Sequence, residues 1–136
     1  MLKKTLFALL CATLIFLTQV SFNRPIFEDY SDSTEVYTCK SGSLCTVTTV
    51  ENFRFPLLSG VKGQSAVIKE DFDFKEFLKK FDAKIVHEEN TEFGVSYYAY
   101  SPKIKYCELV CGKRVNLHVF TGSQVKVGSP IIYGSY

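Results

Sequence analysis

The clearest periodic pattern in the chain is a stripe of large apolar residues between positions 71 and 81. Their spacing of i, i+3, i+4 and i+7 places them on one face of a helix. Asp73 precedes Glu76 by three positions, which is typical of a capping box with Asp in the cap role. We therefore predict a helix over Asp71–Phe81 whose apolar face belongs to the core. The residues of the stripe are Phe74, Phe77, Leu78 and Phe81.

Segments that alternate β-branched or aromatic residues with polar ones predict strands around this helix. Polar tips or glycines separate several of them in pairs, as expected for antiparallel hairpins. The order predicts an α+β domain, with one amphipathic helix packed on a curved antiparallel sheet of about five to seven strands. The predicted segments are a hairpin over Val36–Val50 that turns at Gly42, then Gln64–Lys69, Ala83–Glu88, Phe93–Ser101, Tyr106–Cys111, Arg114–Thr121, Gln124–Val127 and Ile131–Tyr133.

The N-terminus has the layout of a secretory signal, since Lys3 and Lys4 precede an apolar run over Leu6–Leu17. This run is shorter than the ~20 apolar residues that cross a bilayer. The segment Thr18–Ser21 lacks a small-x-small cleavage pattern, so an uncleaved signal anchor stays open as the alternative. We expect export, either to the extracellular face of the cytoplasmic membrane or as a secreted protein. The predicted organisation is a signal peptide or anchor over 1–22, a polar tether over 23–35 and a single domain over 36–136. Only residues 1–22 would contact a membrane, and only if they are not removed.

Charge excludes one class of partner. The formal net charge of +2 comes from Lys3 and Lys4, so the chain without residues 1–22 is neutral. A neutral domain lacks the excess positive charge that binds phosphate backbones, and we predict no nucleic-acid binding. Residues 101–126 are locally basic, with Glu108 as their one acid.

Four cysteines remain after residues 1–22, and an even number in an exported chain favours disulfides. Cys39 and Cys45 flank a hairpin tip, so we expect them to face each other across two strands. Cys107 and Cys111 can pair only if a turn around Gly112 folds them back, because they lie ~13 Å apart along an extended strand. Their spacings do not match the usual zinc pairs, and we predict no metal ion or other cofactor. A four-cysteine metal site stays open if the compartment is reducing.

Four short pieces of the chain carry a family resemblance. In their order and spacing, residues from about 62 to 136 resemble the C-terminal half of YwmB-type proteins, small exported proteins of Gram-positive bacteria. The resemblance implies a fold like that of the TATA-box-binding protein, with a helix on an antiparallel sheet, and it implies no activity. The chain lacks the long N-terminal half of that family, so we expect it to fold alone as a half-sized unit, to form a homodimer, or to replace the missing half with its cysteine-bearing hairpin. The matching pieces are Phe77–Lys84, Ala99–Lys103, Val115–Val119 and Val127–Ile132.

The candidate binding face lies on the predicted strands. Alternation places Val115, Leu117 and Val119 toward the core and leaves the other face of this strand for recognition. Tyrosines of the neighbouring segment suit such a face, because tyrosine combines apolar area with a hydroxyl, although cross-strand aromatic pairs also simply stabilise a sheet. We therefore predict a non-enzymatic domain that binds an unidentified protein or envelope component. The candidate residues are Tyr98, Tyr100, Arg114, Asn116 and His118.

An envelope-associated enzyme is the alternative. Cys107 or Cys111 beside His118 would combine a thiol nucleophile with a base, and paired carboxylates would suit glycoside hydrolysis. The sequence contains no glycine-rich phosphate loop and no nucleophile elbow. We therefore assign no catalytic residue. The carboxylates considered are Asp71, Asp73, Glu88, Glu89 and Glu92.

Overall fold

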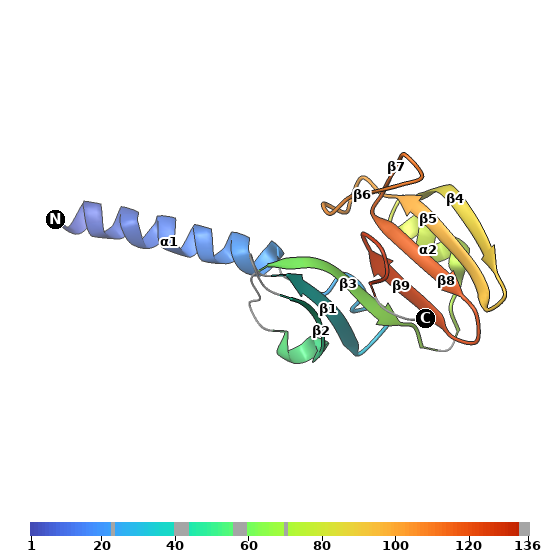
Figure 1. Cartoon of the computed structure of the whole chain (residues 1–136). Helices are drawn as coiled ribbons and strands as arrows, with labels where there is room; N and C mark the ends of the chain where they lie inside the picture. The colour runs from blue at the N-terminus through green and yellow to red at the C-terminus, as the bar shows by residue number, and fades with distance from the viewer. Residues whose placement is uncertain (23, 40–43, 56–59, 70, 134–136) are drawn as a thin grey trace.

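The computed structural model describes residues 1–22, 24–39, 44–55, 60–69 and 71–133 (Figure 1). Within these ranges the chain forms two α-helices, one 3-10 turn and nine strands. In chain order the elements are α1 (Leu2–Phe22), β1 (Ser33–Cys39), β2 (Cys45–Glu51), η1 (Asn52–Arg54), β3 (Val61–Val67), α2 (Phe74–Lys80), β4 (Lys84–Thr91), β5 (Gly94–Tyr100), β6 (Glu108–Val110), β7 (Lys113–Val115), β8 (Leu117–Thr121) and β9 (Val125–Ser129).

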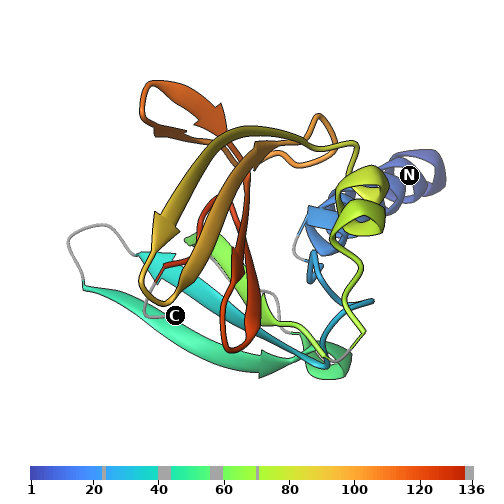
Figure 2. The ribbon, with the colours of Figure 1, turned by 90° about the vertical axis from the view of Figure 1, so that its right-hand side faces the viewer.

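Seven of the strands form one antiparallel sheet in the order β2-β1-β3-β9-β8-β5-β4, and the sheet is not closed. The remaining two, β6 and β7, form a separate hairpin. Figure 2 shows the curvature, with the β1–β2 and β4–β5 hairpins at the two ends of the sheet and α2 to one side of the strands. The predicted α+β fold, with a helix on an antiparallel sheet, is confirmed. The predicted turn at Gly42 lies outside the described residues.

Helix α2 forms where the apolar stripe predicts it and covers one face of the sheet. The Asp73 carboxylate accepts hydrogen bonds from the backbone N–H groups of Lys75 and Glu76, at 2.9 and 3.0 Å, which confirms the predicted cap. Phe77 is fully buried, and the other three residues of the stripe pack against the same cluster. The buried members of this core are Phe27, Ala66, Phe77, Ala99, Leu117, Val119 and Val127.

The predicted polar tether over residues 23–35 is wrong for its described part. Phe27 is fully buried in the core and lies 6.2 Å from Phe77 between ring centroids, and Ser33 already begins β1. Gln64 fixes the segment further, because its side-chain oxygen accepts from the N–H of Ile26. The physical reason is that α2 has only seven residues and covers little of the sheet, so an apolar side chain from this segment completes the core.

Helix α1 extends away from the sheet (Figure 1), and its described side chains are exposed. Across the described part of the chain, no helix is both long and apolar enough to span a lipid bilayer.

The face of the sheet opposite α2 is covered in part by residues 130–133. A Cβ atom on Gly128 would lie 2.8 Å from the Ile132 side chain, and one on Gly63 would lie 2.6 Å from the Tyr133 ring. Tyr133 in turn stacks on Tyr37 of β1, with ring centroids 4.1 Å apart. The two glycines therefore allow residues 130–133 to lie directly on the strands.

Candidate functional site

The candidate residues begin with a cross-strand row on the face opposite α2. His87 of β4, Tyr98 of β5 and His118 of β8 are direct partners in the register of the sheet. The Tyr98 and His118 rings stack with centroids 4.4 Å apart, and His87 lies 5.7 Å from Tyr98 on the other side. Tyr98 is 9% exposed and also donates from its hydroxyl to Glu89 at 3.3 Å. The row is thus largely enclosed rather than open for recognition.

His118 is a buried structural residue, and its predicted role on a binding face is wrong. The side chain is 1% exposed, and its Nδ1 accepts a hydrogen bond of 3.1 Å from the backbone N–H of Ile132. An acceptor at Nδ1 requires the neutral ring with its proton on Nε2. Burial lowers the pKa of His118 to about 4, so the ring is neutral at physiological pH. The histidine thus holds the chain end against the sheet.

Asn116 is also buried, which corrects its predicted place on an exposed face. Its side-chain amide donates to the carbonyls of Ser101 and Ile104, at 2.6 and 2.9 Å, and its Oδ1 accepts from the N–H of Ser101 at 2.7 Å. The residue stands at the break between β7 and β8, inside the segment that alternation predicts as one strand. Its amide ties this break to the chain leaving β5, so its role is structural.

Arg114 and Tyr100 are the two candidates that stay accessible, and they meet at the β6–β7 hairpin. The Arg114 guanidinium lies 5.1 Å from the centroid of the Tyr100 ring. A hydrogen bond to the Cys107 side chain raises the pKa of Arg114, and the charge interaction with Tyr100 raises it further. The guanidinium therefore stays charged. Leu109 is paired directly with Arg114 and is 71% exposed, so it shares that face. We call Tyr100, Leu109 and Arg114 the hairpin surface.

The cysteines divide into one disulfide and a pair of free thiols. Cys39 and Cys45 are bonded across β1 and β2, which confirms that prediction. Cys107 and Cys111, the other candidates for a disulfide, are not bonded to each other, because both residues are free. Cys111 and Gly112 are the two turn residues, with φ of 51° and 73°, as a type I′ turn requires. Cys111 therefore lies at the tip of the hairpin, while Cys107 precedes β6 at its base.

Cys111 makes one contact that the sequence did not predict. Its Sγ lies 3.9 Å from Nε2 of His87 on β4, while His118 and Asn116 are engaged elsewhere. A register shift in β4 between Ile85 and His87 hides this contact from simple alternation. The structure thus separates the thiol–His118–Asn116 grouping and pairs a thiol with the other histidine.

The carboxylates considered for hydrolysis have structural or solvent-facing places. Asp73 caps α2, Glu89 accepts from Tyr98, and Glu88 is exposed on β4. A search of the described residues finds no group of three or more His, Cys, Asp or Glu side chains that could hold a metal ion.

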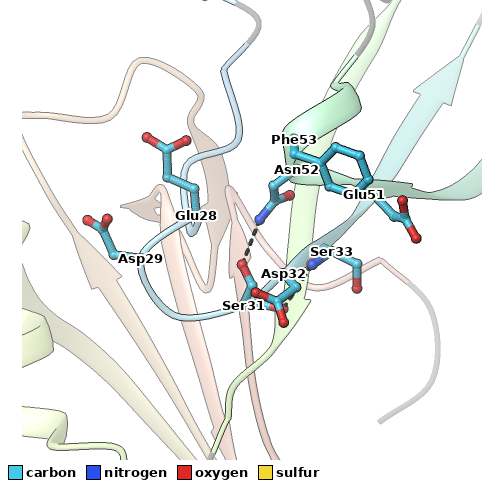
Figure 3. A pocket seen from close by; sticks show the side chains of 8 residues that line it. All are labelled: Glu28, Asp29, Ser31, Asp32, Ser33, Glu51, Asn52 and Phe53. Atoms are coloured by element: carbon cyan, nitrogen blue, oxygen red, sulfur yellow. Dashed lines mark hydrogen bonds between the residues drawn. The ribbon is translucent and has the colours of Figure 1, made fainter.

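An acidic hollow of about 810 Å³ lies where the segment before β1 meets the end of β2 (Figure 3). Asp29 and Asp32 on its wall form ion pairs with Lys80 and Lys69. Asn52 donates to the carbonyl of Ser31 at 2.6 Å, the bond drawn in Figure 3. These contacts hold the segment before β1 against the domain, and they account for much of the polar lining. The hollow is lined by Glu28, Asp29, Ser31, Asp32, Ser33, Glu51, Asn52 and Phe53.

Comparison with protein-family models, curated proteins and solved structures finds no match. The fold and the site together define an α+β domain with an open antiparallel sheet and a disulfide-bonded hairpin. Its accessible candidate residues, Arg114 of β7 and Tyr100 of β5, meet at the β6–β7 hairpin.

Proposed function

We propose that this protein is an exported, non-enzymatic domain that binds a protein or envelope component through the hairpin surface. The proposal keeps Tyr100 and Arg114 of the predicted aromatic and basic face and adds the exposed Leu109. Tyr98, Asn116 and His118 act beneath it as the scaffold that fixes the hairpin and the chain end.

The exposed Leu109 beside Arg114 is the observation that carries this proposal. A large apolar side chain that is 71% exposed, flanked by a guanidinium over an aromatic ring, resembles the composition of binding hot spots. Arginine and tyrosine are enriched at such sites because each combines contact area with directed hydrogen bonds. The hairpin projects from the end of the sheet near β4 and β5 (Figure 1), so a partner could reach it.

Export is part of the proposal, and three observations support it. The Cys39–Cys45 disulfide is compatible with an oxidising compartment. The N-terminal segment has the basic and apolar order of a signal, and α1 makes its described side chains available rather than burying them in the domain. The resemblance of residues 62–136 to YwmB-type proteins points the same way.

Two substitutions on the hairpin surface test the binding function, one that replaces an apolar side chain by a charged one and one that reverses a charge. We expect Leu109→Asp and Arg114→Glu each to weaken capture of the partner from envelope extract by about tenfold or more, as hot-spot losses do. The matched control is Phe93→Asp, which changes a 73% exposed side chain in the turn that joins β4 and β5. Circular dichroism would verify that all three variants fold. Capture that survives both hairpin changes, or that Phe93→Asp abolishes equally, would contradict the proposal.

A thiol-based enzyme is the second candidate, and the Cys111–His87 contact favours it. A thiol 3.9 Å from an imidazole nitrogen has the two groups of a nucleophile and its base. Turnover of a substrate that the Cys111 thiol attacks should then disappear in Cys111→Ser and fall strongly in His87→Asn. Cys107→Ser, on the same hairpin, is the control that should retain it.

A further inference from the structure

The two outer strands of the sheet differ in how their free edges are protected. At one end, β4 carries Lys84, Glu88 and Glu89, and a register shift interrupts its pairing with β5. The Lys113 ammonium of the hairpin also donates to the carbonyl of Val86, at 2.8 Å. Charges, bulges and covering side chains are the devices by which proteins prevent an edge strand from pairing with another chain.

At the other end, β2 carries one charged residue, Glu51 at its last position, and its register with β1 is not interrupted. Residues 46–50 are all threonine or valine, without a charge or a proline. The strand pairs with β1 in an unbroken register from Glu51 to Cys45, where the disulfide fixes its end. Six of its seven residues are exposed. No described strand pairs with its outer edge. The edge is thus unbroken in register, uncharged over residues 46–50 and rich in β-branched residues, which favour strand pairing.

The hydrogen-bond pattern shows which backbone groups of β2 point outward. The N–H of Asn52 donates to the carbonyl of Asp32 at 2.8 Å, so this pair faces inward. Cys39 and Cys45 have Cα atoms 4.3 Å apart, the spacing of a pair that does not exchange backbone hydrogen bonds. Because the two kinds of pair alternate along an antiparallel ladder, the outward N–H and C=O groups belong to the odd-numbered residues. These are Cys45, Val47, Thr49 and Glu51.

We propose that this edge pairs with β2 of a second copy of the chain, antiparallel about a two-fold axis at Thr48. In that register Val47 lies opposite Thr49 of the other copy, and Cys45 lies opposite Glu51, so every outward backbone group meets an outward partner. The two copies of Glu51 lie at opposite ends of the interface between the two β2 strands, so no like charges face each other. Two copies of Thr48 meet at the axis, and Thr–Thr pairs are favourable across strands. The sheet then continues through both copies by an isologous interface.

Disulfide trapping tests this register directly. In a full-length background with Cys11, Cys107 and Cys111 changed to serine, Thr48→Cys places two thiols opposite each other in a pair without backbone hydrogen bonds. Such pairs have Cα atoms about 4.5 Å apart, as Cys39 and Cys45 do at 4.3 Å. We expect mild oxidation to give a covalent dimer. Intact mass and peptide mapping would verify that Cys39–Cys45 is retained.

Val47→Cys in the same background is the matched control. Its two copies lie on a diagonal, about 7–8 Å apart, which exceeds disulfide reach. We expect Thr48→Cys to cross-link at least about tenfold faster than Val47→Cys. Association through the apolar α1 would not distinguish these two neighbouring exposed positions. Equal rates, or faster reaction of Val47→Cys, would overturn the proposed register.

Sedimentation of the full chain in mild detergent provides a second measurement. Thr49→Pro removes one outward N–H, and proline is tolerated on an edge where that group faces solvent. We expect this variant to be monomeric and Thr49→Ala, which keeps the N–H, to stay dimeric. A monomeric wild type would overturn the proposal, whether or not an extended peptide from another protein binds to the edge. Binding at the β6–β7 hairpin is a separate surface, so loss of one activity leaves the other measurable.

Discussion

Replacing His118 by asparagine should remove most of the acid sensitivity of this fold. The ring is buried and neutral, with its pKa lowered from 6.5 to about 4 because burial disfavours the charged form. Protonation at Nδ1 would also replace the acceptor for the Ile132 N–H by a second donor. Asparagine does not titrate, and its Oδ1 can take the place of Nδ1 as an acceptor.

The magnitude follows from proton linkage. The unfolded chain binds a proton on His118 at pH 6.5, whereas the folded chain resists it down to about pH 4. The unfolded state therefore binds more protons in this window, and the stability that is present above pH 6.5 falls as the pH falls. One pKa unit corresponds to 1.36 kcal/mol, so the loss approaches about 3 kcal/mol below pH 4. The steepest change is about 1.4 kcal/mol per pH unit.

Urea unfolding between pH 4.5 and 7.5, followed by far-UV circular dichroism, measures this dependence. The chain has no tryptophan, so circular dichroism reports unfolding more directly than tryptophan fluorescence would. His118→Asn should be less stable than the wild type at pH 7.5, because it loses the ring that stacks on Tyr98, yet its stability should change much less toward pH 4.5. Asn90→Ala, at an exposed position of β4 whose side chain does not titrate, should keep the wild-type slope. An unchanged slope in His118→Asn would refute this assignment of the acid sensitivity.

Two further changes test the scaffold by urea unfolding at neutral pH. Asn116→Ala should lower the free energy of unfolding by about 2–4 kcal/mol, because the carbonyls of Ser101 and Ile104 and the N–H of Ser101 lose their amide partner. The control Asn90→Ala, on exposed β4, should change it by no more than ~0.5 kcal/mol. A loss for Asn116→Ala as small as for Asn90→Ala would mean that water replaces the amide. Asp73→Ala should cost about 1 kcal/mol by removing the cap of α2, and Asp73→Asn should recover most of it, since asparagine caps equally well. An Asp73→Asn variant as unstable as Asp73→Ala would rule out capping as the cause.

Local chemistry was sufficient to predict the helix and one disulfide. The apolar stripe and Asp73 define α2, because helix periodicity and capping depend on residues within four positions of each other. Cys39 and Cys45 are predictable for the same reason, since a hairpin brings residues close in sequence into direct register. The alternation that places Leu117 and Val119 in the core also holds.

The candidate site was predicted only in part. Alternation correctly places His118 on the face opposite Leu117, but it does not reveal whether that face is covered. Residues 130–133 cover it from beyond β9, and this contact depends on Gly63 and Gly128 being small. The Cys111–His87 contact likewise joins two segments 24 positions apart across a register shift.

By itself, the sequence determined the apolar stripe and the cap of α2, the apolar face of the strand that carries Leu117 and Val119, and which cysteines close the first hairpin. These properties depend on neighbours along the chain, so their physical signals are periodic and local. Only the tertiary structure decided that Phe27 belongs to the core, that Asn116 and His118 are buried, and that the β2 edge is the unprotected one. Burial and edge position depend on which distant segments of the chain meet. Irregular segments such as 24–32 and 130–133 have no periodic pattern from which their packing could be predicted.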